Sequence, residues 1–456
     1  MTPPPLHGLS ASAFALLHFI VIVIASASGT TTTTTTTTSL PTDEHGDYNG
    51  SDLIDWIRSH PEGIIHLSLR IGRERPGDLS SPLGLFVKND AESIPISKGD
   101  VIARIPWDMM IQPGGKYHPY KFFSCRAIYN LANELDMGEH SDKAPYVRYL
   151  LSQKRGNMPG EWSRAGSNFL ASEILGNGDL PPYEDSWRAK FDVEWSGGCS
   201  GTDATADPIA HDNERRAYWL ASSRDEDTLM VPVYDMANHS NDPVLLNTVS
   251  YKPARAGDAF LFVSSRDIAS GEQIYNSYNR CNACSGMALS GDCETYSYAR
   301  TPDLYVNFGF VEDYPQYWEF DPQHKDDDSG DDSSDDDDDD DETGFEFCLI
   351  RDEVSGELAA RYIGGSNDMP DAADVAWMTR QLNRLRALSD EKERLEGRHV
   401  RGADGDGNGD VDGDPDKMPR SEWESSWRYH DALSRAIEAA IRSVSKDHNI
   451  LSDGEL

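Results

Sequence analysis

Positive charge is scarce in this chain. Its 41 Lys and Arg residues stand against 79 Asp and Glu residues, which gives a formal net charge of −38 at pH 7 over 456 residues. Proteins that bind nucleic acids need clustered Lys and Arg side chains to neutralise phosphates. The charge balance therefore predicts that nucleic acid is not a partner. An acidic surface suits a basic protein partner, and it also keeps a protein soluble.

Cysteine is scarce as well. The chain has six cysteines, which are too few for a disulfide scaffold at this length. They are Cys125, Cys199, Cys281, Cys284, Cys293 and Cys348. Some of them are expected to pair if the chain enters an oxidising compartment. Three lie within residues 281–293, but a structural zinc ion needs four ligands. This spacing favours a disulfide or free thiols over zinc, and no metal site is predicted.

Long apolar runs are missing except at the N-terminus, where residues 11–27 are mostly apolar. The run ends in Ala25–Ala27, a small-residue pattern typical of signal-peptide cleavage. Residues 1–27 are therefore predicted to be a signal peptide, or a signal anchor that would hold the chain on a membrane only if it stays uncleaved. The run is short for a membrane span, and no Lys or Arg precedes Arg58. We expect entry into the secretory pathway or an organelle, and the final compartment is open.

Three tracts of low complexity divide the chain. Residues 28–50 are rich in threonine and are predicted to be a linker. Residues 321–344 contain a run of acidic side chains that repel one another and cannot pack, so they are predicted to be a disordered linker and a domain boundary. Residues 401–418 form a second acidic, Gly-rich loop. The predicted units are an N-terminal β-rich part at 51–119, a helical insert at 120–220, a second β-rich part at 221–320 and a helical domain at 345–450.

Hydrophobic periodicity predicts an α+β fold. Strands are predicted at residues 83–87, at 101–106 and between 228 and 277, with hairpin turns at 256–258 and 269–271. Helical spacing is found at Leu53–Ile57, in the stripes Ile128–Leu135 and Tyr146–Leu150 of the insert, and in the C-terminal stripes Val375–Leu385 and Trp423–Val444.

Three polar motifs stand out against this background. Residues 231–240 form an apolar run that ends in Asp235, Asn238 and His239. Residues 271–278 begin with glycine and end in a tyrosine, and residues 307–312 follow later in the chain. In this order and at this spacing, the motifs resemble those of SET-domain protein methyltransferases, in the branch of the Rubisco large-subunit lysine methyltransferase.

The resemblance covers residues 52–312, and the C-terminal helices more loosely. It implies a SET-type β-rich fold with a helical insert, followed by an all-α C-terminal domain that presents a surface to a protein substrate. It also implies that S-adenosylmethionine is the cofactor and that a side-chain nitrogen of a non-histone protein is the acceptor. Lysine is favoured, and histidine stays open because a close branch methylates it. The alternative is a catalytically silent SET module that binds proteins.

The resemblance assigns a cofactor role to five residues. Ser81, Pro82 and Leu83 belong to a strand–turn motif whose backbone approaches the cofactor, although Pro82 stands where relatives usually carry glycine. Asn238 and His239 correspond to the pair that grips the cofactor.

It assigns the reacting centre to four further residues. Tyr278 corresponds to the catalytic tyrosine, Arg224 and Asp235 to residues near the substrate, and Phe308 stands where many relatives carry a second tyrosine. Methyl transfer to an amine is an in-line displacement, so positioning carries much of the rate. A tyrosine hydroxyl can orient the lone pair of the nitrogen, which explains why a tyrosine suits this position.

Overall fold

The structure is a computed structural model in which Leu40–Leu456 form one compact unit. The residues that it describes are 50–75, 81–90, 93–113, 117, 125–153, 158–183, 187–188, 191, 208–226, 228–242, 244–278, 300–322, 344–352, 355–363, 369–400 and 416–453. The predicted signal peptide, nearly all of the Thr-rich linker, Cys281, Cys284, Cys293 and the acidic run 326–342 lie outside them. Among the residues described, no helix combines the length and the apolarity that crossing a membrane requires.

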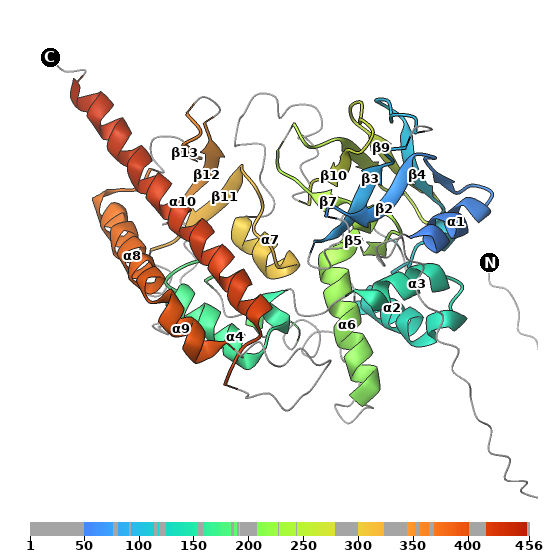
Figure 1. Ribbon diagram of the computed structural model, residues 1–456, viewed down its shortest axis with the longest axis horizontal. Helices are drawn as coiled ribbons and strands as arrows, with labels where there is room; N and C mark the ends of the chain where they lie inside the picture. The colour runs from blue at the N-terminus through green and yellow to red at the C-terminus, as the bar shows by residue number, and fades with distance from the viewer. Residues whose placement is uncertain are drawn as a thin grey trace, which may run out of the picture. The chain divides into compact units, whose positions relative to one another are not determined.

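Two four-stranded sheets form the β-rich part of the molecule (Figure 1). The first has the order β1-β4-β9-β8, and the second has the order β2-β3-β10-β7. Their strands are β1 (Ile64–Ile65), β2 (Leu69–Arg73), β3 (Leu83–Val87), β4 (Val101–Ile105), β7 (Asn238–His239), β8 (Thr248–Tyr251), β9 (Phe260–Ser264) and β10 (Gln273–Asn276). A two-stranded ribbon joins β5 (Asp225–Glu226) to β6 (Leu229–Met230). The two strands predicted at 83–87 and 101–106 are confirmed as β3 and β4.

The pairing of β10 positions the polar motifs. β10 runs antiparallel to β3 and parallel to β7, so that Tyr275 lies opposite Asn238 and Asn276 lies opposite His239. A parallel pair holds both strands in the same direction. The segments that follow β7 and β10 therefore leave the sheet at the same end. Tyr278 is two residues beyond the end of β10.

One of the two predicted hairpins is confirmed and the other is wrong. β8 and β9 pair antiparallel around the turn at 256–258. The turn at 269–271 instead carries the chain from one sheet to the other, because β9 pairs with β4 while β10 pairs with β3. The amide of Gly271 donates to the carbonyl of Val87, and the amide of Val87 donates to the carbonyl of Glu272. These hydrogen bonds pair the segment after the turn with β3. The two segments are far apart in sequence, so a local turn signal does not predict this pairing.

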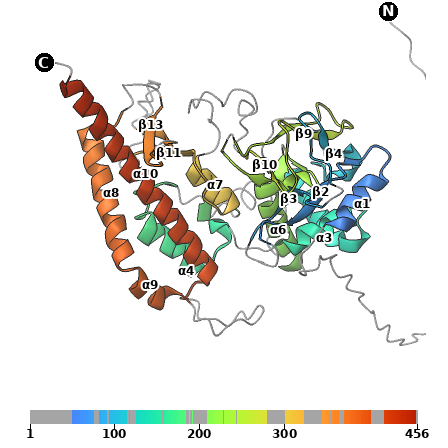
Figure 2. The same cartoon turned by 45° about the horizontal axis from the view of Figure 1, so that its top comes forward.

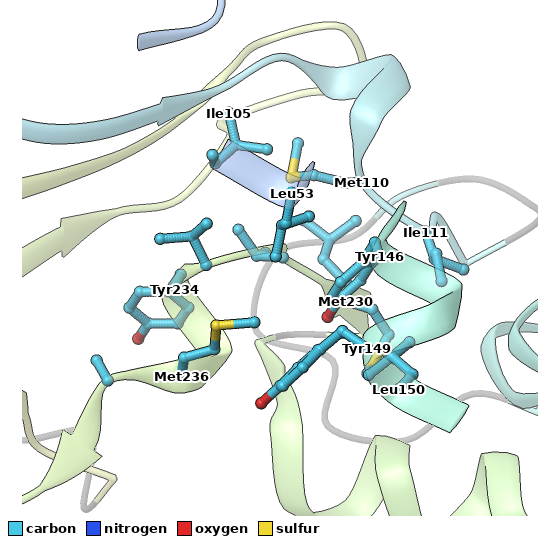
Figure 3. Close-up of a cluster of buried hydrophobic side chains, with 14 of the residues drawn as sticks. Leu53, Ile105, Met110, Ile111, Tyr146, Tyr149, Leu150, Met230, Tyr234 and Met236 are labelled. Atoms are coloured by element: carbon cyan, nitrogen blue, oxygen red, sulfur yellow. The ribbon is translucent and has the colours of Figure 1, made fainter. Parts of the chain in front are cut away.

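Four helices pack against the first core cluster, whose buried residues lie between Leu53 and Met158 and between Phe191 and Ile274. They are α1 (Ser51–Ser59), α2 (Cys125–Met137), α3 (Ala144–Ser152) and α6 (Pro208–Arg224), with short helical turns at Trp107–Met109, Gly138–His140 and Tyr234–Met236. The predicted stripes are confirmed, since the apolar residues of α1, α2 and α3 are buried on one face of each helix. Figure 3 shows Leu53 of α1 and Tyr146, Tyr149 and Leu150 of α3 within this cluster.

The C-terminal region contains a sheet as well as helices. Its strands are β11 (Gln316–Phe320), β12 (Phe345–Arg351) and β13 (Leu358–Tyr362), which pair antiparallel in that order. Its helices are α7 (Thr301–Phe308), α8 (Ala372–Asp390), α9 (Lys392–His399) and α10 (Arg420–Asp453). α10 lies against both α8 and β13, as Figures 1 and 2 show. The α+β class is confirmed and the helices are as predicted, but the description of this region as all-α is corrected by the sheet.

The acidic tract is not a domain boundary. It lies in sequence between β11 and β12, and these two strands pair along their whole length, from Phe320 opposite Phe345 to Gln316 opposite Leu349. Repulsion among acidic side chains indicates that a segment is solvated, and a connection between two neighbouring strands meets that condition as well as a linker does. The run of acidic residues therefore does not indicate a boundary between two domains.

Part of the insert belongs to a second core cluster, whose buried residues lie between Trp162 and Trp187 and between Tyr305 and Ala440. The insert contributes a turn at Pro159–Glu161, helix α4 (Arg164–Phe169) and a π-helical turn at Leu170–Ile174. Ser163, which caps α4, donates from its amide at 2.9 Å and from its hydroxyl at 2.6 Å to the carboxylate of Glu422 on α10. The insert at 120–220 is thus shared between two cores.

Candidate active site

Tyr278 is held from two sides by the segment that follows the polar motif at 231–240. Its hydroxyl donates to the carbonyl oxygen of Ala237 at 2.9 Å, and its amide donates to Nδ1 of His239 at 2.9 Å. Burial raises the pKa of Tyr278 to about 12; Arg224 opposes this effect and Asp235 adds to it. The hydroxyl therefore stays protonated near neutral pH, and its direction is fixed by Ala237.

Aromatic rings surround Tyr278. Its ring centroid lies 4.8 Å from that of Phe308, 5.1 Å from that of His239 and 6.1 Å from that of Phe310. Phe308 ends α7, and Gly309 then adopts a left-handed φ of 77°, with its amide bonded to the carbonyl of Tyr305. This C-cap turns the chain, and glycine is the residue that adopts it without strain. Phe308 and Phe310 therefore lie on the same tyrosine from either side of the turn.

His239 carries a polar atom without a partner. Its Nε2 is buried and has no well-aligned hydrogen-bond partner among the described residues, although the side chain of Asn241 lies close enough to act on the ring. Burial lowers the pKa of His239 to about 3, against a smaller opposing effect of Asn241, so the ring is neutral. Because Nδ1 accepts the amide of Tyr278, the proton belongs on Nε2. A buried N–H donor without an acceptor is costly in a folded protein unless a ligand supplies the acceptor.

Gly84 of β3 makes room for Asn238. A Cβ atom at Gly84 would lie 2.7 Å from Nδ2 of Asn238 and 2.8 Å from Nε2 of Gln273, closer than real Cβ contacts. The absence of a side chain therefore lets the backbone of β3 approach β7. Leu83 precedes Gly84 in β3 and packs against the first core cluster, so its cofactor role stays a prediction.

Ser81 and Pro82 are less closely connected to the site. Ser81 is buried, with its carbonyl bonded to the guanidinium of Arg73 and its hydroxyl accepting the amide of Arg75 at 3.2 Å. Pro82 is exposed. No contact described for either residue joins it to Tyr278 or Asn238, so their cofactor role stays a prediction.

Arg224 and Asp235 form a second, buried part of the site. Nη1 of Arg224 lies 3.8 Å from Oδ2 of Asp235 and donates to the carbonyl oxygen of the same residue at 3.1 Å. Oδ2 accepts the hydroxyl of Tyr146 at 2.9 Å, whereas Oδ1 is buried and has no hydrogen-bond partner among the described residues. Burial raises the pKa of Asp235 to about 6, although Arg224 and Tyr146 oppose it. The carboxyl is mostly ionised at neutral pH and has one oxygen free to accept a hydrogen bond.

The backbone before Asp235 is strained. Val233 has φ 70° and ψ −48°, a conformation that β-branched residues rarely adopt and that costs about 1–3 kcal/mol. The amide of Met236 donates to the carbonyl of Val233, and the amide of Asp235 donates to that of Val231. The resulting turn directs the chain from the buried residue Val231 to the carboxyl of Asp235. Strain of this kind persists only where the surroundings hold it in place, and such positions cluster at functional sites.

The structure brings together most of the residues predicted from sequence. Tyr278, His239 and Phe308 are in ring contact, and Arg224 and Asp235 act electrostatically on Tyr278. The sequence did not indicate Tyr146, which bonds to Asp235, or Phe310, which lies against Tyr278. It also did not indicate Tyr149 and Gln153, which accept hydrogen bonds from Arg224. The tyrosines were recognised only as parts of a buried helical stripe. Two tyrosines on one buried face are a signal in themselves, since a buried hydroxyl needs a hydrogen-bond partner.

Comparison with known proteins agrees with this geometry. Residues 93–279 match the family model of the SET domain. Residues 93–279 are therefore similar to a SET domain, as the motifs predicted.

Among the solved structures that match the chain are those of Rubisco LSMT. The SET domain of LSMT bound to lysine and AdoHcy is 14% identical, with a TM-score of 0.44 over 87% of this chain and 89% of that one. Rubisco LSMT bound to AdoMet is 13% identical, with a TM-score of 0.47 over 87% and 92%. Rubisco LSMT bound to sinefungin and monomethyllysine is 14% identical, with a TM-score of 0.45 over 89% and 91%. No curated protein matches the chain.

Proposed function

We propose that the chain is an S-adenosylmethionine-dependent protein methyltransferase that transfers a methyl group to a side-chain nitrogen of a non-histone protein, with lysine as the acceptor. The observation that carries this proposal is the setting of Tyr278. Its half-buried, protonated hydroxyl belongs to a ring that contacts three other aromatic rings. Beside it lie two buried polar atoms without partners among the described residues, Oδ1 of Asp235 and Nε2 of His239.

The residues present fit the proposed cofactor. His239 has an N–H donor without an acceptor, and the missing side chain at Gly84 makes room for the side chain of Asn238, which fixes the position of its amide. These residues, together with Leu83, would hold S-adenosylmethionine, which supplies a methyl group on a positively charged sulfur. AdoMet, AdoHcy and sinefungin are the molecules named in the solved structures with a related fold.

The chain's own residues prepare the acceptor nitrogen. A lysine with a pKa near ~10.4 must lose a proton before it can react, at a cost of about 4–5 kcal/mol at pH 7. The rings of Tyr278, Phe308 and Phe310 disfavour the charged ammonium by excluding water. Because the hydroxyl of Tyr278 donates to Ala237, its oxygen is left to accept an N–H from the acceptor, which orients the nitrogen lone pair. This help is strongest in the transition state, where it increases rate more than binding.

A catalytically silent SET module is the competing function. Two observations favour it: Pro82 replaces the glycine of the strand–turn motif and is exposed, and Phe308 has no hydroxyl to offer the site. In that case the C-terminal helices would bind a protein partner and the cofactor site would be vestigial. Cofactor binding discriminates between the two functions.

Calorimetric titration of S-adenosylmethionine into the chain and into residues 40–456, which form a compact unit, tests the proposal. We expect micromolar binding that Asn238→Ala abolishes and that Asn213→Ala, on α6, leaves unchanged. A search for protein substrates with radiolabelled cofactor then follows. A folded chain that binds no cofactor would exclude the enzyme and leave the binding module.

We also propose that the protein works in an oxidising compartment reached through its N-terminal segment. Cys125 at the start of α2 is disulfide-bonded, and such bonds persist in oxidising compartments. Microscopy of the chain with and without residues 1–27, fused at its C-terminus to a fluorescent protein, tests this. Unchanged cytosolic distribution of both forms would contradict the proposal.

A further inference from the structure

Two buried tyrosines of α3 connect the insert to the candidate active site. Tyr146 is 0% exposed and Tyr149 is 1% exposed, and their rings stack with centroids 6.2 Å apart. Figure 3 shows both side chains leaving the same helix towards the segment that carries Met236. They are three positions apart in sequence, which places them on one face of the helix.

Their hydroxyls contact the two charged groups of the site, one each. The hydroxyl of Tyr146 donates to Oδ2 of Asp235 at 2.9 Å. The hydroxyl of Tyr149 accepts from Nη1 of Arg224 at 2.9 Å, and the guanidinium carbon lies 5.5 Å from the Tyr149 ring centroid. Gln153, one turn further along the chain, accepts from Nη2 of Arg224 at 2.9 Å. α3 and Gln153, which follows it, therefore supply a hydrogen-bond donor to the carboxylate of Asp235 and two acceptors to the guanidinium of Arg224.

Core packing alone does not explain these hydroxyls. A buried tyrosine needs one partner for its hydroxyl, and a backbone carbonyl or a water molecule would meet that need. Here each hydroxyl contacts a charged group, the kind of hydrogen bond that is about twice as strong as a neutral one. The ion pair itself is loose at 3.8 Å, so other groups must fix the positions of Arg224 and Asp235.

We propose that Tyr146 and Tyr149 are positioning residues that hold the Arg224–Asp235 pair in place beside Tyr278. The inference rests on the proposed function for its catalytic meaning. The groups that face the carboxyl of Asp235 are Arg224 of α6, the two tyrosines of α3 and Tyr278 after β10. Only Tyr146 donates a hydrogen bond to that carboxyl from α3 among the described contacts. Its hydroxyl therefore favours the ionised form of Asp235.

The sign of the expected pH effect follows from this contact. Burial already raises the pKa of Asp235 above its ordinary value of 3.8, to about 6, and removing the Tyr146 hydroxyl must raise it further. In Tyr146→Phe the carboxyl stays protonated to a higher pH, by about one pH unit, the scale of losing one hydrogen bond to a charged group. The variant therefore loses stability relative to the wild type as pH rises through this range.

The experiment compares the pH dependence of unfolding for wild type, Tyr146→Phe, Asp235→Asn and the double variant of the full chain. We expect Tyr146→Phe to become progressively less stable than wild type as the pH is raised from about 4 to about 8, and its effect in the Asp235→Asn background to be independent of pH. Tyr218→Phe, which removes another fully buried hydroxyl in the same core cluster, is the control. A Tyr146→Phe effect that is flat with pH, as for the control, would overturn the inference.

Enzyme kinetics give the second readout. We expect Tyr146→Phe to lower kcat more near pH 6.5 than near pH 8.5. We expect Tyr149→Phe to reduce kcat about tenfold with little change in KM. Both variants act through the position of Arg224 and Asp235. Equal losses at both pH values would contradict the positioning role. Wild-type protein that transfers no methyl group would refute the proposed function, while the unfolding experiment would still decide whether Tyr146 controls Asp235.

Discussion

Replacing Glu312 with glutamine should remove a large pH-dependent loss of stability. Glu312 closes the motif at 307–312, and its residue is 5% exposed. The hydroxyl of Thr301 donates to Oε1 at 2.6 Å, but Oε2 is buried and has no hydrogen-bond partner among the described residues. Burial raises the pKa of Glu312 to about 8; Thr301 opposes this effect, and Asp313 and Asp303 add to it.

The magnitude follows from the difference between the folded and unfolded pKa values. The unfolded chain releases the Glu312 proton near 4.5 and the folded protein near 8, so the folded state binds more protons between these values. Stability therefore falls as pH rises from 4.5 and levels off above about 8. At about 1.4 kcal/mol per pH unit, the full interval corresponds to at most about 5 kcal/mol. Glu312→Gln has no proton to lose, so its stability relative to wild type should increase by about 3–5 kcal/mol across this range.

Urea unfolding of both proteins from about pH 5 to about pH 9 measures this difference. Glu424→Gln on α10, whose parent side chain is 59% exposed, is the matched control, and its difference from wild type should stay within about 0.5 kcal/mol. If wild type and Glu312→Gln show parallel pH dependence, Glu312 is ionised in the folded protein at neutral pH. The buried Oε2 would then not raise the pKa of Glu312.

The remaining predictions concern the reacting centre, the cofactor side and the cysteines. Tyr278→Phe should lower kcat about 100-fold and change the Kd for S-adenosylmethionine less than about twofold, as kinetics and calorimetry would measure, because the hydroxyl acts in the transition state. Gly84→Ala should weaken cofactor binding about tenfold by displacing Asn238, a loss that calorimetry measures. Alkylation of native protein, read by mass spectrometry, should label neither Cys125, which is disulfide-bonded, nor Cys348, which is buried. After unfolding without reductant, the reagent should label Cys348 and still not Cys125.

Each of these predictions has an outcome that contradicts it. Equal loss of affinity and rate in Tyr278→Phe would place the hydroxyl in cofactor binding. Gly397→Ala, at a position of α9 where a Cβ meets nothing, is the control for Gly84→Ala and should not weaken binding. Labelling of Cys125 in native protein would show that the bond does not form in the purified chain.

The site was predictable where the polar residues are close in sequence to strong strand signals. The glycine-led segment before Tyr278 indicated a strand, which β10 is, whereas the apolar run before Asp235 forms a turn and a short helix that lead into β7. The parallel pairing of β7 with β10 brings the two segments together. Phe310 was missed because its role depends on the left-handed turn at Gly309, which places it on the same tyrosine as Phe308.

The fold was predictable to the level of its elements and less so in how they associate. Hydrophobic periodicity identified the buried face of α3. It predicts which side chains are buried but not where a hydroxyl points, so it could not predict the contacts of Tyr146 and Tyr149. The sheet of β11 to β13 was missed because a long acidic tract separates two strands that pair directly. The composition of the tract gives no information on strand pairing, because that pairing depends on contacts between the residues on either side of it.

The bond between Ser163 and Glu422 has a consequence for the order in which the protein is made. The two residues are 259 positions apart, and the segment that Ser163 opens belongs to the same core cluster as α10. At a synthesis rate of roughly 5–20 residues per second, that segment waits on the order of 10–50 s for its partner to leave the ribosome. During this interval the apolar side chains between Trp162 and Trp187 lack the part of their core that α10 supplies. The core around this segment is therefore completed only when the last helix has been made.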